Sequence, residues 1–120
     1  MKIKKRIELI KEEVSDINAK GINFFPVITE RDGAPNFSLR LFEIEPDGHT
    51  PYHNHDWEHE VYIIDGCGFI NGENKKLRIE KSDFIFVEPG ETHQFIAGES
   101  GLKMICIVPN KGQPCIKCNN

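Results

Sequence analysis

The chain has 120 residues and a mass of 13.7 kDa, which is enough for one domain. Fifteen Lys and Arg residues stand against nineteen Asp and Glu residues, and the resulting formal net charge of −4 excludes a basic surface for nucleic acid. Apolar residues make up 38% of the chain, which is too many for a disordered chain, yet no apolar run is long enough to span a bilayer. The N-terminus lacks the apolar stretch of a secretory signal, so we expect a cytoplasmic protein that binds neither nucleic acid nor a membrane.

Residues 1–20 form an N-terminal segment for which two structures are open. Four apolar residues recur there at helical spacing: Ile7, Ile10, Val14 and Ile17. This spacing predicts a short amphipathic helix. A strand added to the edge of a sheet is the alternative.

From residue 21 onward the chain consists of short β-rich runs. The runs are INFFPVIT, FSLRLFEIEP, HEVYII, CGFI, KLRIE, FIFVE, HQFIA and LKMICIV. Turn residues separate them at Asp65-Gly66, Asn71-Gly72, Ser82-Asp83, Pro89-Gly90 and Gly98 to Gly101. The Asn-Gly pair gives the strongest hairpin signal. Many short strands without a long helix predict an all-β antiparallel sandwich or small barrel over residues 21–110.

Histidines are concentrated before one of these runs. His53 and His55 are two residues apart and share a face if their segment is extended, while His59 and His93 each open a predicted strand. Imidazole nitrogens that converge inside a barrel are suitable donors for a first-row transition metal, and several buried imidazoles without partners would be costly. We therefore predict that His53, His55, His59 and His93 are metal ligands.

The same residues resemble the two motifs of the cupins. The first cupin motif is Gly, five residues, His-x-His, three or four residues, Glu, six residues and Gly, and the corresponding residues here are Asp47, His53, His55, His59 and Gly66. In the second motif Gly90 and His93 match, whereas Ser82 and Ala97 depart from its first Gly and its final Asn. The resemblance covers roughly residues 22 to 110. It is closest to small single-domain bacterial cupins with four His ligands and manganese.

This resemblance implies a fold, a metal and a class of activity. The fold is the cupin double-stranded β-helix, a jelly-roll barrel, and the metal is a divalent transition ion, with manganese expected first and iron, nickel or zinc as alternatives. The family includes dioxygenases, decarboxylases and sugar isomerases. We expect a metal-dependent enzyme that acts on a small carboxylate, keto acid or sugar-derived molecule by Lewis-acid or oxygen-activating chemistry. A non-catalytic sensor or small-ligand binding module is the alternative, and a metal that only braces the barrel is a third.

His59 stands where most cupins carry a Glu ligand. Four neutral imidazoles leave a divalent site at +2, whereas three imidazoles and one carboxylate leave it at +1. The higher charge attracts an anionic ligand more strongly and lowers the pKa of bound water further. We therefore expect a small anionic ligand.

Three further residues are candidates for contacting that ligand. The apolar alternation of the second strand predicts that Arg40 faces solvent, and the alternative is a clamp on a substrate carboxylate. Trp57 and Tyr52 flank the histidines and are predicted to wall the pocket; core packing or a dimer contact is the alternative.

Cysteines and oligomerisation complete the sequence-based expectations. Residues 111–120 form a C-terminal tail with a CxxC pair, Cys115 and Cys118, for which free thiols are expected and a zinc shared across a dimer or a disulfide are alternatives. Cys67 and Cys106 lie in apolar strands and are predicted to be buried. We expect a homodimer, with a contact surface on the first strand formed by Ile22, Phe24, Phe25 and Val27.

Overall fold

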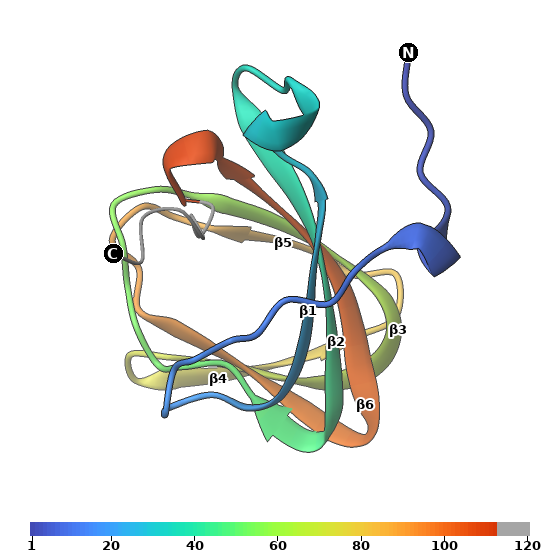
Figure 1. Cartoon of the computed structure of the whole chain (residues 1–120). Coiled ribbons are helices and arrows are strands. Elements are labelled where there is room, and N and C mark those ends of the chain that lie inside the picture. The colour runs from blue at the N-terminus through green and yellow to red at the C-terminus, as the bar shows by residue number, and fades with distance from the viewer. Residues whose placement is uncertain (113–120) are drawn as a thin grey trace.

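The computed structural model describes residues 1–112 and contains one curled antiparallel sheet of six strands. The strands are β1 (Lys20–Ile28), β2 (Phe37–His49), β3 (His59–Gly72), β4 (Lys75–Glu80), β5 (Phe84–Val87) and β6 (His93–Pro109). Three short 3-10 helices accompany them: η1 (Arg6–Glu8), η2 (Glu30–Asp32) and η3 (Asn110–Gly112). The strands curl around a common interior (Figure 1), which is the predicted all-β jelly-roll barrel.

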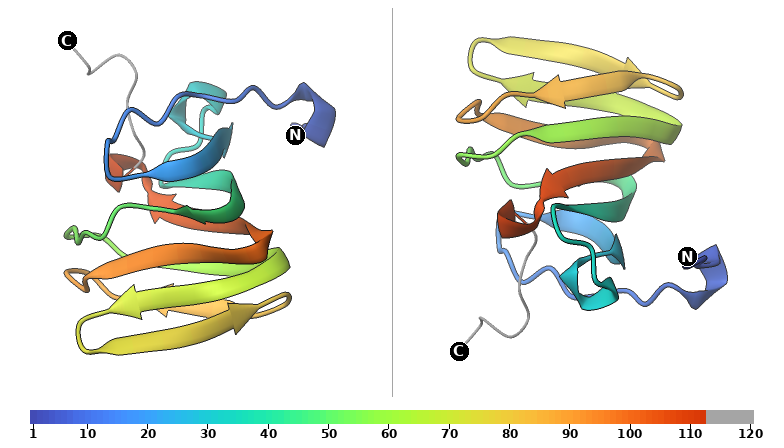
Figure 2. Two further views of the ribbon diagram at one scale, coloured as in Figure 1. Left: turned by 90° about the horizontal axis from the view of Figure 1, so that it is seen from below. Right: turned by 90° about the horizontal axis from the view of Figure 1, so that it is seen from above.

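Two long strands, β3 and β6, hold the barrel together. The strand order is β1-β2-β6-β3-β4, and β5 pairs with β3 as well. The first part of β3 pairs with β5 and its last part pairs with β4, while β6 runs antiparallel along nearly all of β3. In Figure 2, β1 and β4 therefore lie at opposite ends of the stack of strands.

Two of the predicted turns are bends within continuous strands. Asp65-Gly66 lies inside β3 and Gly98 to Gly101 lies inside β6, where the pairing between these strands shifts register. At Gly66 the φ angle is 87°, and a Cβ there would collide with the carbonyl oxygen of Gly101. The separate runs HEVYII and CGFI thus belong to one bulged strand. The predicted hairpin after Asn71-Gly72 is present, although its two loop residues are Glu73 and Asn74.

The N-terminal segment forms neither the predicted amphipathic helix nor a full edge strand. It contains only η1 and a single antiparallel bridge between Glu12 and Phe24. Ile7, Ile10 and Ile17 are exposed, and of the four periodic residues only Val14 is partly buried, at the cavity, so no continuous apolar surface faces this segment. The helix prediction is therefore wrong for residues 1–20.

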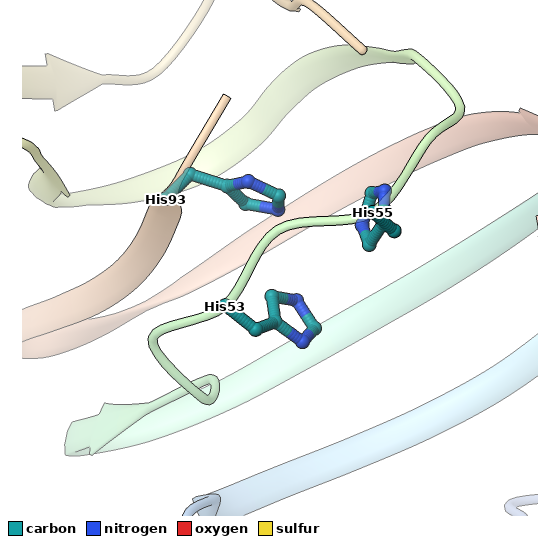
Figure 3. Close-up of side chains that lie close together, drawn as sticks. All are labelled: His53, His55 and His93. Carbon is teal, nitrogen blue, oxygen red and sulfur yellow. The ribbon is translucent and has the colours of Figure 1, made fainter. Parts of the chain in front are cut away.

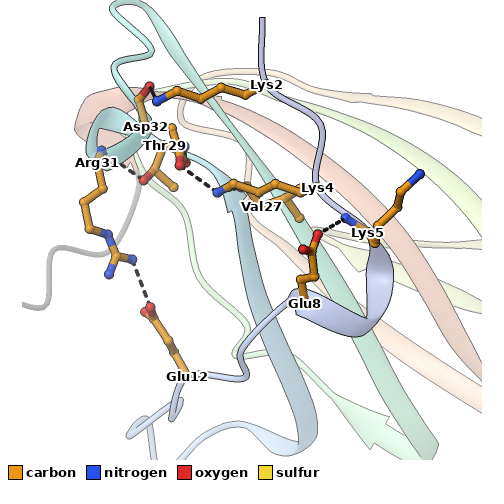
Figure 4. A network of polar contacts seen from close by, with 9 residues as sticks. All are labelled: Lys2, Lys4, Lys5, Glu8, Glu12, Val27, Thr29, Arg31 and Asp32. Atoms are coloured by element: carbon orange, nitrogen blue, oxygen red, sulfur yellow. Dashed lines mark hydrogen bonds and ion pairs between the residues drawn. The ribbon is translucent and has the colours of Figure 1, made fainter.

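Polar contacts fasten this segment to the outside of the barrel (Figure 4). Lys4 Nζ donates to the Val27 carbonyl at 2.6 Å and pairs with the Asp32 carboxylate at 2.7 Å. Arg31 pairs with Glu12 at 2.9 Å. The segment therefore follows β1 and η2 as an extended strap, which brings residues 12–16 to the rim of the barrel interior.

The hydrophobic core fills the barrel interior. Its buried members come from β2 to β6: Ile44, Val61, Ile63, Ile79, Val87, Phe95, Ala97, Leu102, Met104, Cys106 and Val108. Cys106 is buried as predicted, whereas Cys67 is only partly buried. No helix within residues 1–112 is long and apolar enough to cross a membrane. Cys115 and Cys118 lie outside the described residues.

Candidate metal centre

Main-chain hydrogen bonds place two of the histidines side by side. His53 and His93 form an isolated antiparallel bridge, in which the amide of each residue donates to the carbonyl of the other at 3.1 and 2.9 Å. The chain then continues to His55, whose carbonyl accepts from the Gly90 amide at 2.7 Å. The Pro-Gly turn before β6 and the His-x-His segment therefore hold each other in place.

Three imidazoles converge at this point (Figure 3). One ring nitrogen from each of His53, His55 and His93 lies within 4.8 Å of the other two. Nδ1 of His55 is 3.1 Å from the Trp57 carbonyl, and Nδ1 of His93 is 2.8 Å from the Glu91 carbonyl. Since a carbonyl only accepts, both Nδ1 atoms carry the proton and both Nε2 atoms keep a lone pair for a metal. This donor set fits a divalent transition metal.

His59 lies beside this group without being part of it. It is the first residue of β3 and is buried, at 7% exposure. Its Nε2 lies 2.7 Å from Nε2 of His55, and its Nδ1 lies 2.9 Å from the Cys106 sulfur. The structure therefore brings all four predicted histidines together, and ligation by each of them stays a prediction.

The electrostatics of the site keep these imidazoles neutral. Burial lowers the pKa of His53, His55 and His93 below the ordinary value of 6.5. For His59, burial and then the nearby Arg40 guanidinium lower the pKa to about 2. Neutral imidazole is the form that binds a metal, so the protonation state of His53, His55 and His93 at neutral pH is compatible with coordination.

The histidines border a cavity of about 630 Å³. Its walls are largely apolar and include aromatic side chains from β1, β2 and β6: Phe24, Phe42 and Phe95. Trp57 stacks flat on His55, with ring centroids 4.4 Å apart and an interplanar angle of 5°, and lines the cavity as predicted. Tyr52 is 50% exposed and is not among the lining residues, so its predicted place in the wall is wrong. The loop after Pro51 turns it outward, which the sequence did not reveal.

Arg40 faces the inside of the barrel, which contradicts the predicted solvent orientation. It lines the cavity and is 6% exposed. Arg40 and Leu41 do lie on opposite faces of β2, as the alternation predicts, but both faces are covered. Leu41 lies opposite Phe25 on the outer face, and Arg6 of the N-terminal strap stacks on that phenyl ring at 4.2 Å. The apolar outer residues were therefore mistaken for the core-facing ones.

Cys106 lines the cavity, whereas its sequence context predicts only that it is buried. It is the direct neighbour of Arg40 across the β2–β6 pairing, and its sulfur accepts from Arg40 Nη2 at 3.0 Å. The alternation of Met104, Cys106 and Val108 signals a common inward face. Their proximity to Arg40 depends on strand register, which that pattern leaves open.

Comparisons with known proteins identify the family. The cupin domain family matches residues 40–108. No protein in a search of curated proteins matches the chain at a significant level. Among solved structures, the polyketide cyclase RemF from Streptomyces resistomycificus is 31% identical with a TM-score of 0.87, and the match covers 95% of this chain and 82% of that one.

Two more distant structures share the fold. A predicted oxalate decarboxylase from Thermotoga maritima is 21% identical over 90% of this chain and 98% of its own, with a TM-score of 0.78. KdgF from a Halomonas species is 17% identical over 88% and 90% of the two chains, with a TM-score of 0.74. The family match spans more than half of the sequence and contains β3, β4, β5, most of β2 and β6, and the four histidines described above. The chain belongs to the cupin domain family.

Proposed function

We propose that this cupin is a metal-dependent enzyme that acts on a small carbonyl-bearing molecule by Lewis-acid chemistry. The observation that carries the proposal is the group of three imidazole nitrogens within 4.8 Å of one another, at the wall of a cavity of about 630 Å³. That volume is in the usual range for small-molecule sites. A metal held by His53, His55 and His93 would polarise a carbonyl oxygen of the bound molecule.

The residues around the histidines supply the remaining parts of the site. The aromatic wall provides apolar surface for the body of the substrate and excludes water from it. His59 stays neutral because burial lowers its pKa to about 2, so it would add no positive charge beside a metal held by the other three histidines. The identity of the metal stays open to experiment, since imidazole donors suit zinc, iron and nickel as well as the expected manganese.

Similarity to a polyketide cyclase favours one reaction type. Ring closure of a poly-β-carbonyl chain joins an enol carbon to a carbonyl carbon and involves no net oxidation. Such a substrate is planar where it is enolised, which suits stacking on the aromatic wall, and it is rich in carbonyl oxygens that a metal held by the imidazole group would bind. We therefore propose β-carbonyl compounds as the substrate class.

Metal analysis and turnover test this proposal together. Full-length protein purified without a tag or added metal is analysed for metal, and loss of heptane-2,4,6-trione is followed with and without oxygen. We expect about one metal ion per chain and turnover that is equal in air and under nitrogen. The His93→Ala variant should lose both metal and turnover, and the His49→Ala variant should keep both.

Two results would contradict the Lewis-acid proposal. Turnover that requires oxygen would assign oxygen-activating chemistry instead. Tight binding of the trione without any conversion, in metal-loaded protein, would favour the non-catalytic binding module.

A further inference from the structure

Arg40 is a buried cation without a carboxylate partner. None of the ion pairs among residues 1–112 includes it. Its Nη2 donates to the Cys106 sulfur at 3.0 Å and lies 3.4 Å from His59 Nδ1, while its Nε has no hydrogen-bond acceptor in the described structure. Burying a charge is costly unless an opposite charge accompanies it.

Neither neighbour of Arg40 neutralises that charge. Burial raises the pKa of the Cys106 thiol, so the thiol is uncharged at pH 7. The His59 ring, 3.4 Å from Arg40 Nη2, is an imidazole and carries no negative charge. Carboxylates do occur at the rim of the cavity, in the N-terminal strap, but none forms an ion pair with Arg40, and Glu12 is already paired with Arg31. The positive charge of the guanidinium is therefore not paired with an anion among residues 1–112.

The position of Arg40 makes the cavity the place where an anion would meet it. The side chain extends from β2 into the cavity wall, between the histidines and the apolar surface, and its Cζ lies 5.2 Å from the centre of the Phe42 ring. Phe42 in turn packs against Phe24, with ring centroids 5.0 Å apart. A ligand that lies in this part of the cavity meets the Arg40 guanidinium beside the rings of Phe24 and Phe42.

We propose that Arg40 binds a carboxylate of the ligand, so that the cavity selects molecules with an apolar body and a carboxylate over their uncharged analogues. The inference rests on the proposed function only in taking this cavity as the ligand site. A planar guanidinium is suited to this task because it donates to a carboxylate through two parallel hydrogen bonds. The substrate of the proposed reaction is thus a β-carbonyl acid.

Trp57 makes the test direct, because it is the only tryptophan of the chain and lines the cavity. Its fluorescence is titrated with benzoate and with benzamide, which have nearly the same shape and differ in charge. We expect wild-type protein to bind benzoate about tenfold more tightly than benzamide, as a charge-assisted hydrogen bond would give. Both titrations are made on the full chain as purified and again after removal of metal with EDTA.

Three variants assign that preference to Arg40. Arg40→Met should bind benzamide as the wild type does and lose the preference for benzoate. Arg40→Lys should keep part of the preference, because it keeps the charge without the planar fork. Arg78→Met removes an exposed arginine of β4 and should keep all of it.

The inference is overturned if wild-type protein binds both probes equally, if Arg40→Met still prefers benzoate, or if that variant loses both probes to the same extent. It is also overturned if the preference disappears with the metal, since the metal would then hold the carboxylate. If Arg40→Met does not fold, Arg40→Lys decides the matter, because its preference for benzoate should be smaller than that of wild-type protein, and an unchanged preference would overturn the inference. If the preference for benzoate persists in EDTA and the protein does not convert the trione, carboxylate binding by Arg40 is supported. Only the proposed function is then contradicted.

Discussion

His53 and His93 reach the centre from backbone positions that hydrogen-bond to each other, so either ring can be removed while the main-chain bridge remains. We predict that His53→Ala lowers metal affinity at least about tenfold and leaves the fold intact. Metal content by elemental analysis and β-structure by circular dichroism measure the two parts of the prediction. His49→Ala is the matched control, because His49 does not line the cavity. Equal metal content in the two variants would show that His53 is not a metal ligand.

The lowered pKa values of the cluster predict how metal binding depends on pH. Three imidazoles with the ordinary pKa of 6.5 would each be half protonated at pH 6.5, which would weaken binding about sixfold relative to pH 7.5. Burial lowers the pKa of His53, His55 and His93, so protons compete only as the pH falls through these lower values. We expect metal affinity at pH 6.5 to be nearly that at pH 7.5. Competition with a chromophoric chelator at both pH values tests this, and a loss of about sixfold between pH 7.5 and pH 6.5 would contradict it.

The arrangement of elements brings two glycines with positive φ into different surroundings. Gly66 in β3 has a φ of 87° and lies against the Gly101 carbonyl, whereas Gly33 after η2 has a φ of 90° and open space around it. Alanine at Gly33 should cost about 1 kcal/mol through its backbone conformation alone. Alanine at Gly66 should cost about 1–3 kcal/mol more, because the strands must also move apart. Urea unfolding of both variants measures the difference, and equal costs would show that the bulge adapts.

The N-terminal strap carries an ion pair whose contribution depends on pH. The hydrogen bond from Lys4 holds the pKa of Asp32 below its usual value. A lowered folded-state pKa means that Asp32 contributes stability above its unfolded pKa and loses it as the pH falls through the folded value. Asp32→Asn should therefore be less stable than wild type by about 0.2–1 kcal/mol at pH 7, and the difference should shrink at pH 3.

Urea unfolding at the two pH values measures this change. Asp56→Asn serves as the control. Asp56 is more exposed than Asp32, and its ion pair with Lys111 is long, at 3.9 Å, so its loss should change stability little at either pH. A gap between wild type and Asp32→Asn that stays constant with pH would assign the effect to the capping bond that Asp32 accepts from the Thr29 amide.

Particular elements show which features the sequence could predict. The strand pattern and the Asn-Gly hairpin are local signals, so both the barrel and the β3–β4 hairpin were predictable. The histidines were found because His-x-His and a histidine after Pro-Gly are also local patterns. The inward orientation of Arg40 was not predictable, because it depends on Arg6 and Phe25 covering the outer face of β2. The helix predicted from the N-terminal periodicity does not form, because no apolar surface covers the isoleucines of this segment. Here a covering surface is missing, whereas at β2 an unforeseen one is present.

For the whole molecule, the remaining question is association with a second copy. The expected dimer surface on β1 is partly used within the chain, because Phe24 lines the cavity and Phe25 is buried under Arg6. Apolar side chains that do remain exposed belong mainly to the N-terminal strap and to β5, where Phe84 is 82% exposed.

We therefore predict that the homodimer uses the strap. Light scattering should give twice the chain mass of 13.7 kDa for the wild type. The Ile7→Ser/Ile10→Ser variant should be monomeric, since it removes apolar area that only association would bury. Phe84→Ser is the comparison variant and should remain dimeric. A wild-type monomer, or a monomer only with Phe84→Ser, would contradict this surface.

The bridge between His53 and His93 also has a consequence for how such a centre can diversify. Main-chain atoms alone form the bridge, so the identity of either side chain is independent of the bonds that set its location. A carboxylate or thiolate introduced at position 53 or 93 would arrive at the same point with a harder or softer donor atom. The barrel can therefore exchange one donor at a time and change its preference among metals without redesigning the scaffold.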